Sequence, residues 1–333
     1  MSGEPVISVI VPAYNAAVTI GAALASVEVQ TERRLEILVV DDASTDSTVQ
    51  TVLDQAARDA RIRLICLTTN GGPAVARNRG IAEARGPWIA LLDADDRYAP
   101  DRLAILLQLA ETQGADMVAD NIVLHDAAGL VPDTSMIPRT ILSQASRLEI
   151  AEFIERNVGT RDLPRVSYGF LKPLIRTAFL REHGIAYDER NRFAEDYMLY
   201  VTCLLRGAAW WLIPEGMYLY TVRKGSLTEV QSSEDLMRIR QMEADLLDNP
   251  LVAGKPDLVR ALRRHKSVID RCYYYRAFTD ALKARAPGLA AKLFFESPLS
   301  ARLIVSESMR QVPLILSKAA SGGYRDNKRP TAQ

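Results

Sequence analysis

The chain has 333 residues, of which 48% are hydrophobic and 25% charged, and these are ordinary values for a soluble globular protein. They exclude a disordered, collagen-like or disulfide-framework class for the bulk of the chain, and the length suggests one large domain with an appendage, or two domains. The formal net charge is zero, but residues 251–333 carry 16 Lys and Arg against 6 Asp and Glu. The C-terminal quarter is therefore basic and the rest acidic, which indicates an anionic partner for that quarter.

The cysteines and the lack of a visible targeting signal indicate where in the cell we expect the protein. Cys66, Cys203 and Cys272 are far apart and odd in number, so they predict reduced thiols and neither a disulfide framework nor a zinc site. We find no basic signal-peptide start and no apolar run of about 18 residues. We therefore expect a cytoplasmic protein without a transmembrane helix, and peripheral attachment to the inner face of the cell membrane stays open.

The first half of the chain alternates strand and helix patterns. Nearly continuous apolar runs, typical of strands buried on both faces of a parallel sheet, occupy residues 6–11, 35–40, 61–67, 88–92 and 117–124. Helical spacing fills the intervals, at residues 16–29, about 46–60, 74–84 and 101–113. This order predicts an α/β fold with a mostly parallel, doubly wound central sheet and helices on both faces.

The second half is less regular. Residues 126–147 are expected to form a loop, helices are expected near 148–157, 177–183 and 195–206, and short strands at 210–213 and 218–220. From residue 233 onward the pattern is helical, with breaks expected at prolines 250, 287, 298 and 313. We therefore divide the chain into an α/β domain at 1–225, a basic helical region at 226–320 and a flexible tail at 321–333.

Three acidic residues follow the expected strand at 88–92: Asp93, Asp95 and Asp96. Burying carboxylates together is costly unless a cation compensates them. Oxygen ligands without a nearby histidine favour Mg²⁺ or Mn²⁺ over zinc, and Mg²⁺ usually combines one or two carboxylates with substrate phosphates. The cluster therefore predicts a diphosphate carried by a metal ion. The alternative is a simple acidic helix start, a role that Asp101 already fills.

Other polar positions leave two interpretations open. Asp42 ends the second strand. Either Asp42 or Ser44 can cap the next helix, or Asp42 can bind a base or ribose, and we favour binding because ligands of such sheets lie at the carboxyl ends of strands. Arg77 can pair with phosphate, orient a carboxylate or be a surface charge. Glu195 and Asp196, at a loop-to-helix junction, can complement the helix dipole, or one can act as a general base that the other supports.

Taken in order, four segments closely resemble family 2 glycosyltransferases of the GT-A fold, a Rossmann-like architecture. They are Val6 to Asn15, Val39 to Asp46, Gly80 to Asp96, and Glu195-Asp196-Tyr197. The resemblance covers about residues 5–225. Residues 168–176, together with 193–197, look more narrowly like the succinoglycan-type exopolysaccharide glucosyltransferases of bacteria.

The resemblance implies a nucleotide-diphospho-sugar donor, most often a UDP-sugar. Pro12, Ala13, Tyr14 and Asp42 match the uridine-binding positions of the family. Arg77 matches a basic position near the nucleotide in some members.

The acidic motifs take their roles from the same resemblance. Asp93 and Asp95 match the D-x-D motif, in which Asp95 would contact the metal, Mn²⁺ or Mg²⁺, and Asp93 would lie nearer the ribose. The role of Asp96 stays open. Asp196 matches the catalytic base, and Glu195 would support it.

The implied reaction is inverting transfer: the acceptor hydroxyl, deprotonated by Asp196, attacks the anomeric carbon in line. The Q-x-x-R-W motif of processive members is not visible after the Glu-Asp pair, which favours transfer of a single sugar. We expect transfer from UDP-glucose to a lipid-linked oligosaccharide in exopolysaccharide biosynthesis. The alternatives are another cell-surface glycan, such as lipopolysaccharide or capsule, or a non-catalytic nucleotide-sugar binding protein. A nucleotidyltransferase would need a Gly-rich phosphate loop, which residues 11–17 do not provide.

The basic C-terminal region interleaves cations with apolar residues, at 255–285 and again at 289–319. This pattern indicates amphipathic helices. Such helices can lie on an anionic membrane surface, pack against the catalytic domain, or form a homodimer interface. We do not expect a nucleic-acid partner, because no binding motif accompanies the charge.

Overall fold

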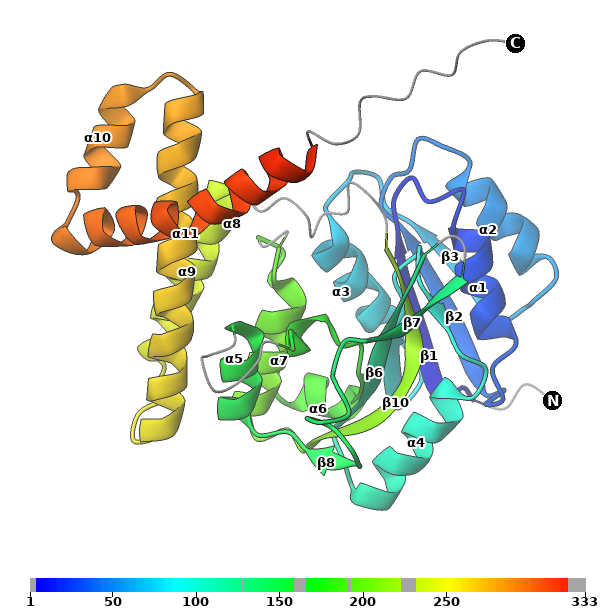
Figure 1. Ribbon diagram of the computed structural model, residues 1–333. Helices are drawn as coiled ribbons and strands as arrows, with labels where there is room; N and C mark the ends of the chain where they lie inside the picture. The colour runs from blue at the N-terminus through cyan, green and yellow to red at the C-terminus, as the bar shows by residue number, and fades with distance from the viewer. Residues whose placement is uncertain (1–3, 127–128, 159–165, 191–192, 223–231, 323–333) are drawn as a thin grey trace, which may run out of the picture. The chain divides into compact units, whose positions relative to one another are not determined.

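A computed structural model of the protein describes residues 4–126, 129–158, 166–190, 193–222 and 232–322. By its internal contacts the chain divides into two units, one within Met1–Val230 and Leu247–Leu262, and the other within Gln231–Leu246 and Arg263–Gln333. The α/β architecture lies in the first unit and helices make up the second, as Figure 1 shows by colour along the chain.

One mixed sheet forms the centre of the first unit. Among the described residues it has ten strands: β1 (Ile7–Ala13), β2 (Leu35–Asp41), β3 (Ile62–Cys66), β4 (Trp88–Leu91), β5 (Arg97–Tyr98), β6 (Met117–Asp126), β7 (Gly129–Ser135), β8 (Ser146–Arg147), β9 (Leu174–Arg176) and β10 (Trp210–Thr221). The order is β3-β2-β1-β4-β9-β6-β10-β5, with β7 beside β6 and β8 beside β10. Pairs β1–β2, β2–β3, β1–β4 and β6–β10 are parallel, which confirms the α/β prediction.

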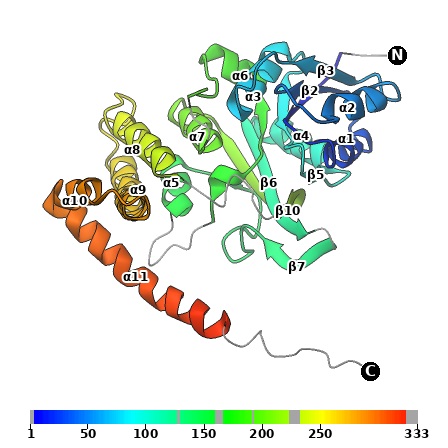
Figure 2. The same cartoon turned by 90° about the horizontal axis from the view of Figure 1, so that it is seen from above.

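The helices of this unit are α1 (Ile20–Glu28), α2 (Thr48–Ala56), α3 (Pro73–Glu83), α4 (Arg102–Gln113), α5 (Ile150–Val158), α6 (Thr177–Glu182) and α7 (Glu195–Leu205), with a 3₁₀ turn at Tyr168–Phe170. Figures 1 and 2 show α1 and α2 on one side of the sheet and α3 on the other. Because Gly80 of α3 has no side chain, the helix can lie directly on β1: a Cβ atom there would come within 2.4 Å of Ile10. Helices on both faces explain why β1 and β2 are almost entirely buried.

Several sequence-based boundaries were wrong. The segment 126–147 is not simply a loop, because β7 and β8 lie within it. The two short strands expected at 210–213 and 218–220 are one strand, β10, because pairing with β6 continues past Pro214 through register shifts around Gly216. The helix expected at about 46–60 is α2, which begins at Thr48 with Ser47 as its N-cap, so neither Asp42 nor Ser44 caps it.

The second unit is helical, as expected for the C-terminal region. Its chain segments contain α8 (Ser233–Leu247), most of α9 (Pro256–Lys283), α10 (Pro287–Phe295) and α11 (Pro298–Gly322). Leu236, Tyr273, Tyr274 and Ile304 form one buried cluster in this unit, and Ala281, Ala290 and Leu293 form another. The break expected at Pro313 is absent because α11 continues to Gly322, whereas residues 323–333 of the expected tail lie outside the described residues. Within the described part of the chain, no helix is both long and apolar enough to span a bilayer.

Candidate active site

The carboxyl ends of β1, β2 and β4 bring several predicted residues to one edge of the sheet. The Asp42 backbone N–H donates to the Ala13 carbonyl at 2.8 Å, so the ends of β1 and β2 are in contact. Ile10 of β1 pairs with Leu91 of β4, two residues before Asp93. The segment at 12–14 and the acidic cluster therefore leave the sheet from adjacent strands. Pro12 is half-buried, Ala13 is buried, and Tyr14 is 51% exposed.

Asp42 is buried, and its carboxylate is bonded to protein backbone. Its two oxygens accept hydrogen bonds from the N–H groups of Gly71 (2.8 Å) and Gly72 (2.7 Å), at the start of α3. Gly72 has a φ of 90°, a left-handed conformation that glycine adopts without strain. Asp42 thus ties the end of β2 to the loop that leads into α3.

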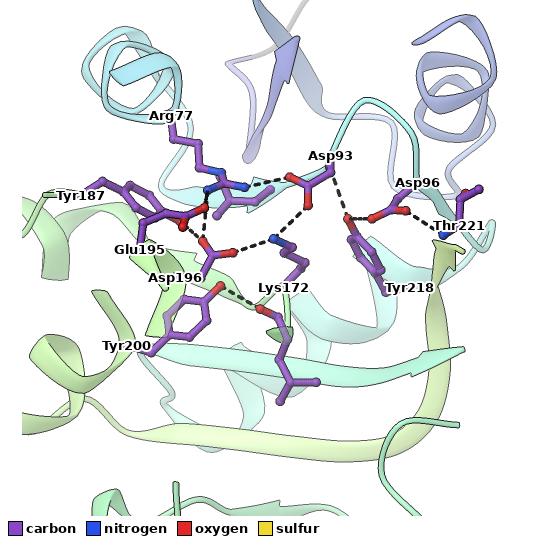
Figure 3. A network of polar contacts seen from close by, with 12 residues as sticks. Arg77, Asp93, Asp96, Lys172, Tyr187, Glu195, Asp196, Tyr200, Tyr218 and Thr221 are labelled. Atoms are coloured by element: carbon purple, nitrogen blue, oxygen red, sulfur yellow. Dashed lines mark hydrogen bonds and ion pairs between the residues drawn. The ribbon is translucent and has the colours of Figure 1, made fainter. Parts of the chain in front are cut away.

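Arg77 of α3 connects the two acidic motifs. Its Nη2 lies 2.9 Å from Asp93, and its Nη1 lies 2.7 Å from Glu195 and 3.4 Å from Asp196 (Figure 3). Only 4% of Arg77 is exposed, so the surface-charge interpretation is wrong for this residue, although it holds for the neighbouring Arg79. A buried guanidinium with fixed donors is suited to holding several carboxylates in one arrangement.

A second buried cation, Lys172, lies between the same motifs. Its Nζ is 3.0 Å from Asp93 Oδ2 and 2.6 Å from Asp196 Oδ2 (Figure 3). The other oxygen of Asp196 accepts a hydrogen bond from the Tyr187 hydroxyl at 2.9 Å. Both oxygens of Asp93 and both of Asp196 therefore contact cationic or hydroxyl partners.

Glu195 and Asp196 occupy the first turn of α7. The partial positive charge of a helix N-terminus favours carboxylates there. The residue before them, Ala194, has a φ of 59°, which costs a non-glycine residue about 1–2 kcal/mol and directs the chain sharply into the helix. The rings of Phe153 and Tyr197 stack with their centroids 5.5 Å apart and pack α7 against α5. This contact anchors α7 in the core.

Asp96 and Asp95 lie on the β10 side of the cluster. Asp96 accepts hydrogen bonds from the Tyr218 hydroxyl (2.7 Å) and the Thr221 N–H (2.8 Å). The Thr221 hydroxyl donates to the backbone carbonyl of Asp95, whose side chain is half-buried. These contacts place the acidic loop against the end of β10.

The electrostatics follow from burial and from these pairs. Burial, followed by the charge of Asp93, raises the pKa of Asp96 to about 7. Burial opposes ionisation of Asp93, but the charges of Lys172 and Arg77 outweigh it, so the pKa of Asp93 falls well below its usual range. Burial and the neighbouring Asp196 raise the pKa of Glu195 despite the attraction of Arg77.

The donor set fits a hard divalent cation. Arg77 and Lys172 face three carboxylates, Asp93, Glu195 and Asp196, so this network retains a net negative charge before Asp95 is counted. A diphosphate would be repelled unless a cation accompanied it. Among the described residues, no group of three or more His, Cys, Asp or Glu side chains is arranged to hold a metal by itself. A site of one carboxylate completed by substrate phosphates, as Mg²⁺ usually has, agrees with this arrangement.

Sequence reasoning missed three members of the site: Lys172, Tyr187 and Tyr218. Lys172 lies within residues 168–176, which resemble the family, but the sequence assigns it no role. A signal was available, because a single lysine between Leu171 and Pro173 in an apolar stretch indicates a buried and therefore paired cation. The tyrosines had no such signal, since buried aromatic residues are ordinary core.

Comparison with known proteins places these features in a family. The model of "Glycosyl transferase family 2" matches residues 8–170. The chain is 36% identical over 285 residues to the succinoglycan biosynthesis protein ExoU of Rhizobium meliloti, which covers 85% of this chain and 81% of that protein. It is 38% identical over 306 residues to ExoO of the same organism, covering 90% and 86%.

Solved structures share the fold. Staphylococcus aureus TarS 1–349 in complex with UDP aligns with a TM-score of 0.63 at 21% identity, covering 92% of this chain and 91% of that one. The mannosyltransferase PcManGT from Pyrobaculum calidifontis, in complex with GDP-Man and Mn²⁺, aligns with a TM-score of 0.59 at 19% identity, covering 93% and 81%. At these identities the likeness concerns the fold alone.

Proposed function

Since the chain belongs to glycosyl transferase family 2, we propose that it transfers a single sugar from a nucleotide-diphospho-sugar to an acceptor hydroxyl with inversion. This proposal rests on one observation: Arg77 and Lys172 each form ion pairs with both Asp93 and Asp196. One carboxylate belongs to the expected donor site and the other is the expected base. Their convergence from distant parts of the chain is what direct transfer between two substrates requires.

The donor we propose is UDP-glucose, bound at the ends of β1, β2 and β4. TarS has been solved with UDP and with UDP-GlcNAc, which supports a uridine nucleotide. The exposed ring of Tyr14 is available to stack on a base, and Pro12 and Ala13 lie next to it. Asp42 would act on the nucleotide through the loop that it holds, because its oxygens are bonded to Gly71 and Gly72.

We propose that Asp95 holds Mn²⁺ or Mg²⁺ together with the donor diphosphate. When bound, the ion offsets the negative charge that develops on the departing diphosphate. Asp95 occupies the metal-contacting position of the D-x-D motif in the resemblance, and its backbone carbonyl accepts from the Thr221 hydroxyl, which holds the acidic loop beside the end of β10. Arg77, close to Asp93, adds a fixed positive charge on the donor side.

Asp196 is the base of this mechanism. The acceptor oxygen bonds to the anomeric carbon, its proton passes to Asp196, and the bond from that carbon to the diphosphate oxygen breaks with its electron pair leaving on the nucleotide. Glu195 supports the geometry of the site, because its carboxylate accepts a hydrogen bond from Arg77 Nη1 at 2.7 Å. No covalent enzyme intermediate is needed.

The acceptor we propose is a lipid-linked oligosaccharide in exopolysaccharide biosynthesis. The relatives ExoU and ExoO are succinoglycan biosynthesis proteins, which supports the exopolysaccharide part of this proposal. The second unit supports contact with an anionic membrane surface. Phe295, Leu299 and Met309 are 80%, 55% and 70% exposed, and Arg302 and Arg310 are also exposed on α11. Exposed apolar side chains flanked by cations are typical of helices that lie on anionic lipid. A second copy of the chain is the competing occupant.

Turnover of UDP-glucose with Mn²⁺ tests the proposal, with UDP release and UDP binding measured separately. Asp196→Asn should lower turnover by about 10²–10⁴-fold, because a general base is lost, while UDP binding changes little. Asp188→Asn is the matched control, because Asp188 pairs with Arg190 at the surface. Equal turnover by Asp196→Asn and the parent would contradict the assignment. Binding of UDP-sugar without turnover by the parent would favour the non-catalytic alternative.

A further inference from the structure

The carbonyl groups beside Lys172 are bound to buried side chains. Arg102, which is fully buried, donates to the carbonyl oxygen of Lys172 and forms an ion pair with Asp120 at 2.8 Å. The Tyr200 hydroxyl donates to the Leu171 carbonyl at 2.8 Å (Figure 3). Arg102 and Tyr200 thus hold the carbonyl groups of two consecutive residues. The backbone from which the Lys172 side chain extends is therefore fixed.

The Lys172 side chain is 6% exposed, so its charged end lies in the interior beside two carboxylates. Burial would lower the pKa of Lys172, but the charges of Asp196 and Asp93 outweigh burial and raise it. An ammonium group that keeps its proton cannot take up the proton of the acceptor hydroxyl. Its possible contributions are charge and geometry.

The contacts of Asp196 divide between its two oxygens. Oδ1 accepts from Tyr187 and faces Arg77 at 3.4 Å, whereas Oδ2 contacts Lys172 at 2.6 Å. Lys172 is the cation that contacts Oδ2, and without it the carboxylate could rotate about its Cβ–Cγ bond. The same loss would release Asp93 Oδ2 on the donor side.

We infer that Lys172 is a positioning residue, which fixes the carboxylate of Asp196 and couples it to Asp93 of the donor site. This inference rests on the proposed role of Asp196 as the base. Lys172 acts through these two carboxylates, at a fixed distance from each.

The split between kcat and UDP binding distinguishes positioning of the base from a merely structural role, because a misplaced base slows the chemical step and leaves the donor bound. The groups that face Asp196 are the cations Lys172 and Arg77, together with Glu195 and Tyr187. A neutral side chain at position 172 removes the charged contact to Oδ2 of Asp196, whereas arginine keeps a cation there. Turnover should therefore fall in a neutral variant and return in part when the charge is kept.

The experiment compares Lys172→Met, Lys172→Gln and Lys172→Arg in the full chain, with UDP-glucose and saturating Mn²⁺. Both neutral variants should lose kcat by about 10²-fold, while UDP binding changes little. Lys172→Arg, which keeps the charge, should recover kcat by at least about tenfold over the neutral variants. Lys255→Met, at an exposed site, is the matched control.

The outcomes separate this inference from the proposed function. A parental kcat in a folded neutral variant, with Asp196→Asn inactive, overturns the role of Lys172 alone. An active Asp196→Asn overturns both. If neither neutral variant folds, Lys172→Arg decides, because a folded arginine variant that turns over as slowly as Asp196→Asn contradicts positioning by charge.

Discussion

The Arg77 guanidinium lies 2.7 Å from the Glu195 carboxylate, although 118 positions separate the two residues in the sequence. The contact joins α3, which follows the third strand, to the start of α7. Each residue is buried or nearly so, and each needs the other because an isolated buried charge is costly. The donor side and the acceptor side of the proposed reaction are thus joined by a contact that also stabilises the fold.

Arg77→Ala should lower both stability and turnover. Removal of one partner of a buried ion-pair network leaves uncompensated charge and costs about 3–5 kcal/mol. Thermal or denaturant unfolding measures the loss. Arg79→Ala is the control, because Arg79 is exposed and pairs with Glu83 on the same helix, and it should change stability by less than about 1 kcal/mol. Equal stabilities of the two variants would argue against the network.

Asp95→Ala should weaken Mn²⁺-dependent binding of UDP by at least about tenfold, because the ion loses its protein carboxylate while the donor diphosphate still needs a cation. Titration calorimetry with UDP, with Mn²⁺ present or chelated, measures the effect. Asp101→Ala, at the N-cap of α4, provides the control outside the cluster. Binding of equal strength in the parent and Asp95→Ala, independent of metal, would remove the metal role.

Glu36→Gln should destabilise the chain by about 2 kcal/mol at neutral pH, as expected for the loss of hydrogen bonds to a charged group. The Glu36 side chain is 4% exposed, and its carboxylate accepts hydrogen bonds from the Ser8 hydroxyl (2.6 Å) and the Arg85 backbone N–H (2.7 Å). Burial opposes its ionisation, but these bonds and the Arg85 charge prevail and lower the pKa of Glu36.

The sign of the pH dependence follows from that lowered pKa. The contribution of Glu36 is complete above the pKa of the unfolded state, about 4.3, and is lost as the pH falls through the folded pKa. The difference in unfolding free energy between the parent and Glu36→Gln should therefore shrink below about pH 4. Glu149→Gln, at an exposed site, should show neither effect. A difference that stays constant down to pH 3 would contradict the assignment.

Flotation with liposomes tests the membrane proposal. The triple variant Phe295→Ser, Leu299→Ser, Met309→Ser should float much less with anionic vesicles than the parent, because it loses exposed apolar area. Val18→Ser, at a 97% exposed position of the first unit, should float like the parent. Parental binding that is equal on neutral and anionic vesicles, or unchanged in the triple variant, would reject this surface. A concentration-dependent dimer lost in the triple variant would assign the surface to a second copy.

Local pattern predicted the elements of the sheet well and failed where pairing extends them. β1, β2 and β4 were recognised because strands covered by helices on both faces need continuous apolar runs. For β10 the pattern predicts two short strands, one on each side of Pro214, but the partner strand β6 pairs with both parts and makes them one strand. The residues next to Pro214 in the sequence do not reveal this pairing with β6.

For the site, the sequence by itself determined which carboxylates exist and that they follow strands or open a helix, because the turn and the apolar run are local features. Only the tertiary structure decided their partners: Asp42 is bonded to the backbone at Gly71 and Gly72, Arg77 is buried, and Lys172 lies between Asp93 and Asp196. The reason is physical. The energy of a charge depends on its burial and on groups within a few ångströms, and folding brings those groups from distant parts of the chain.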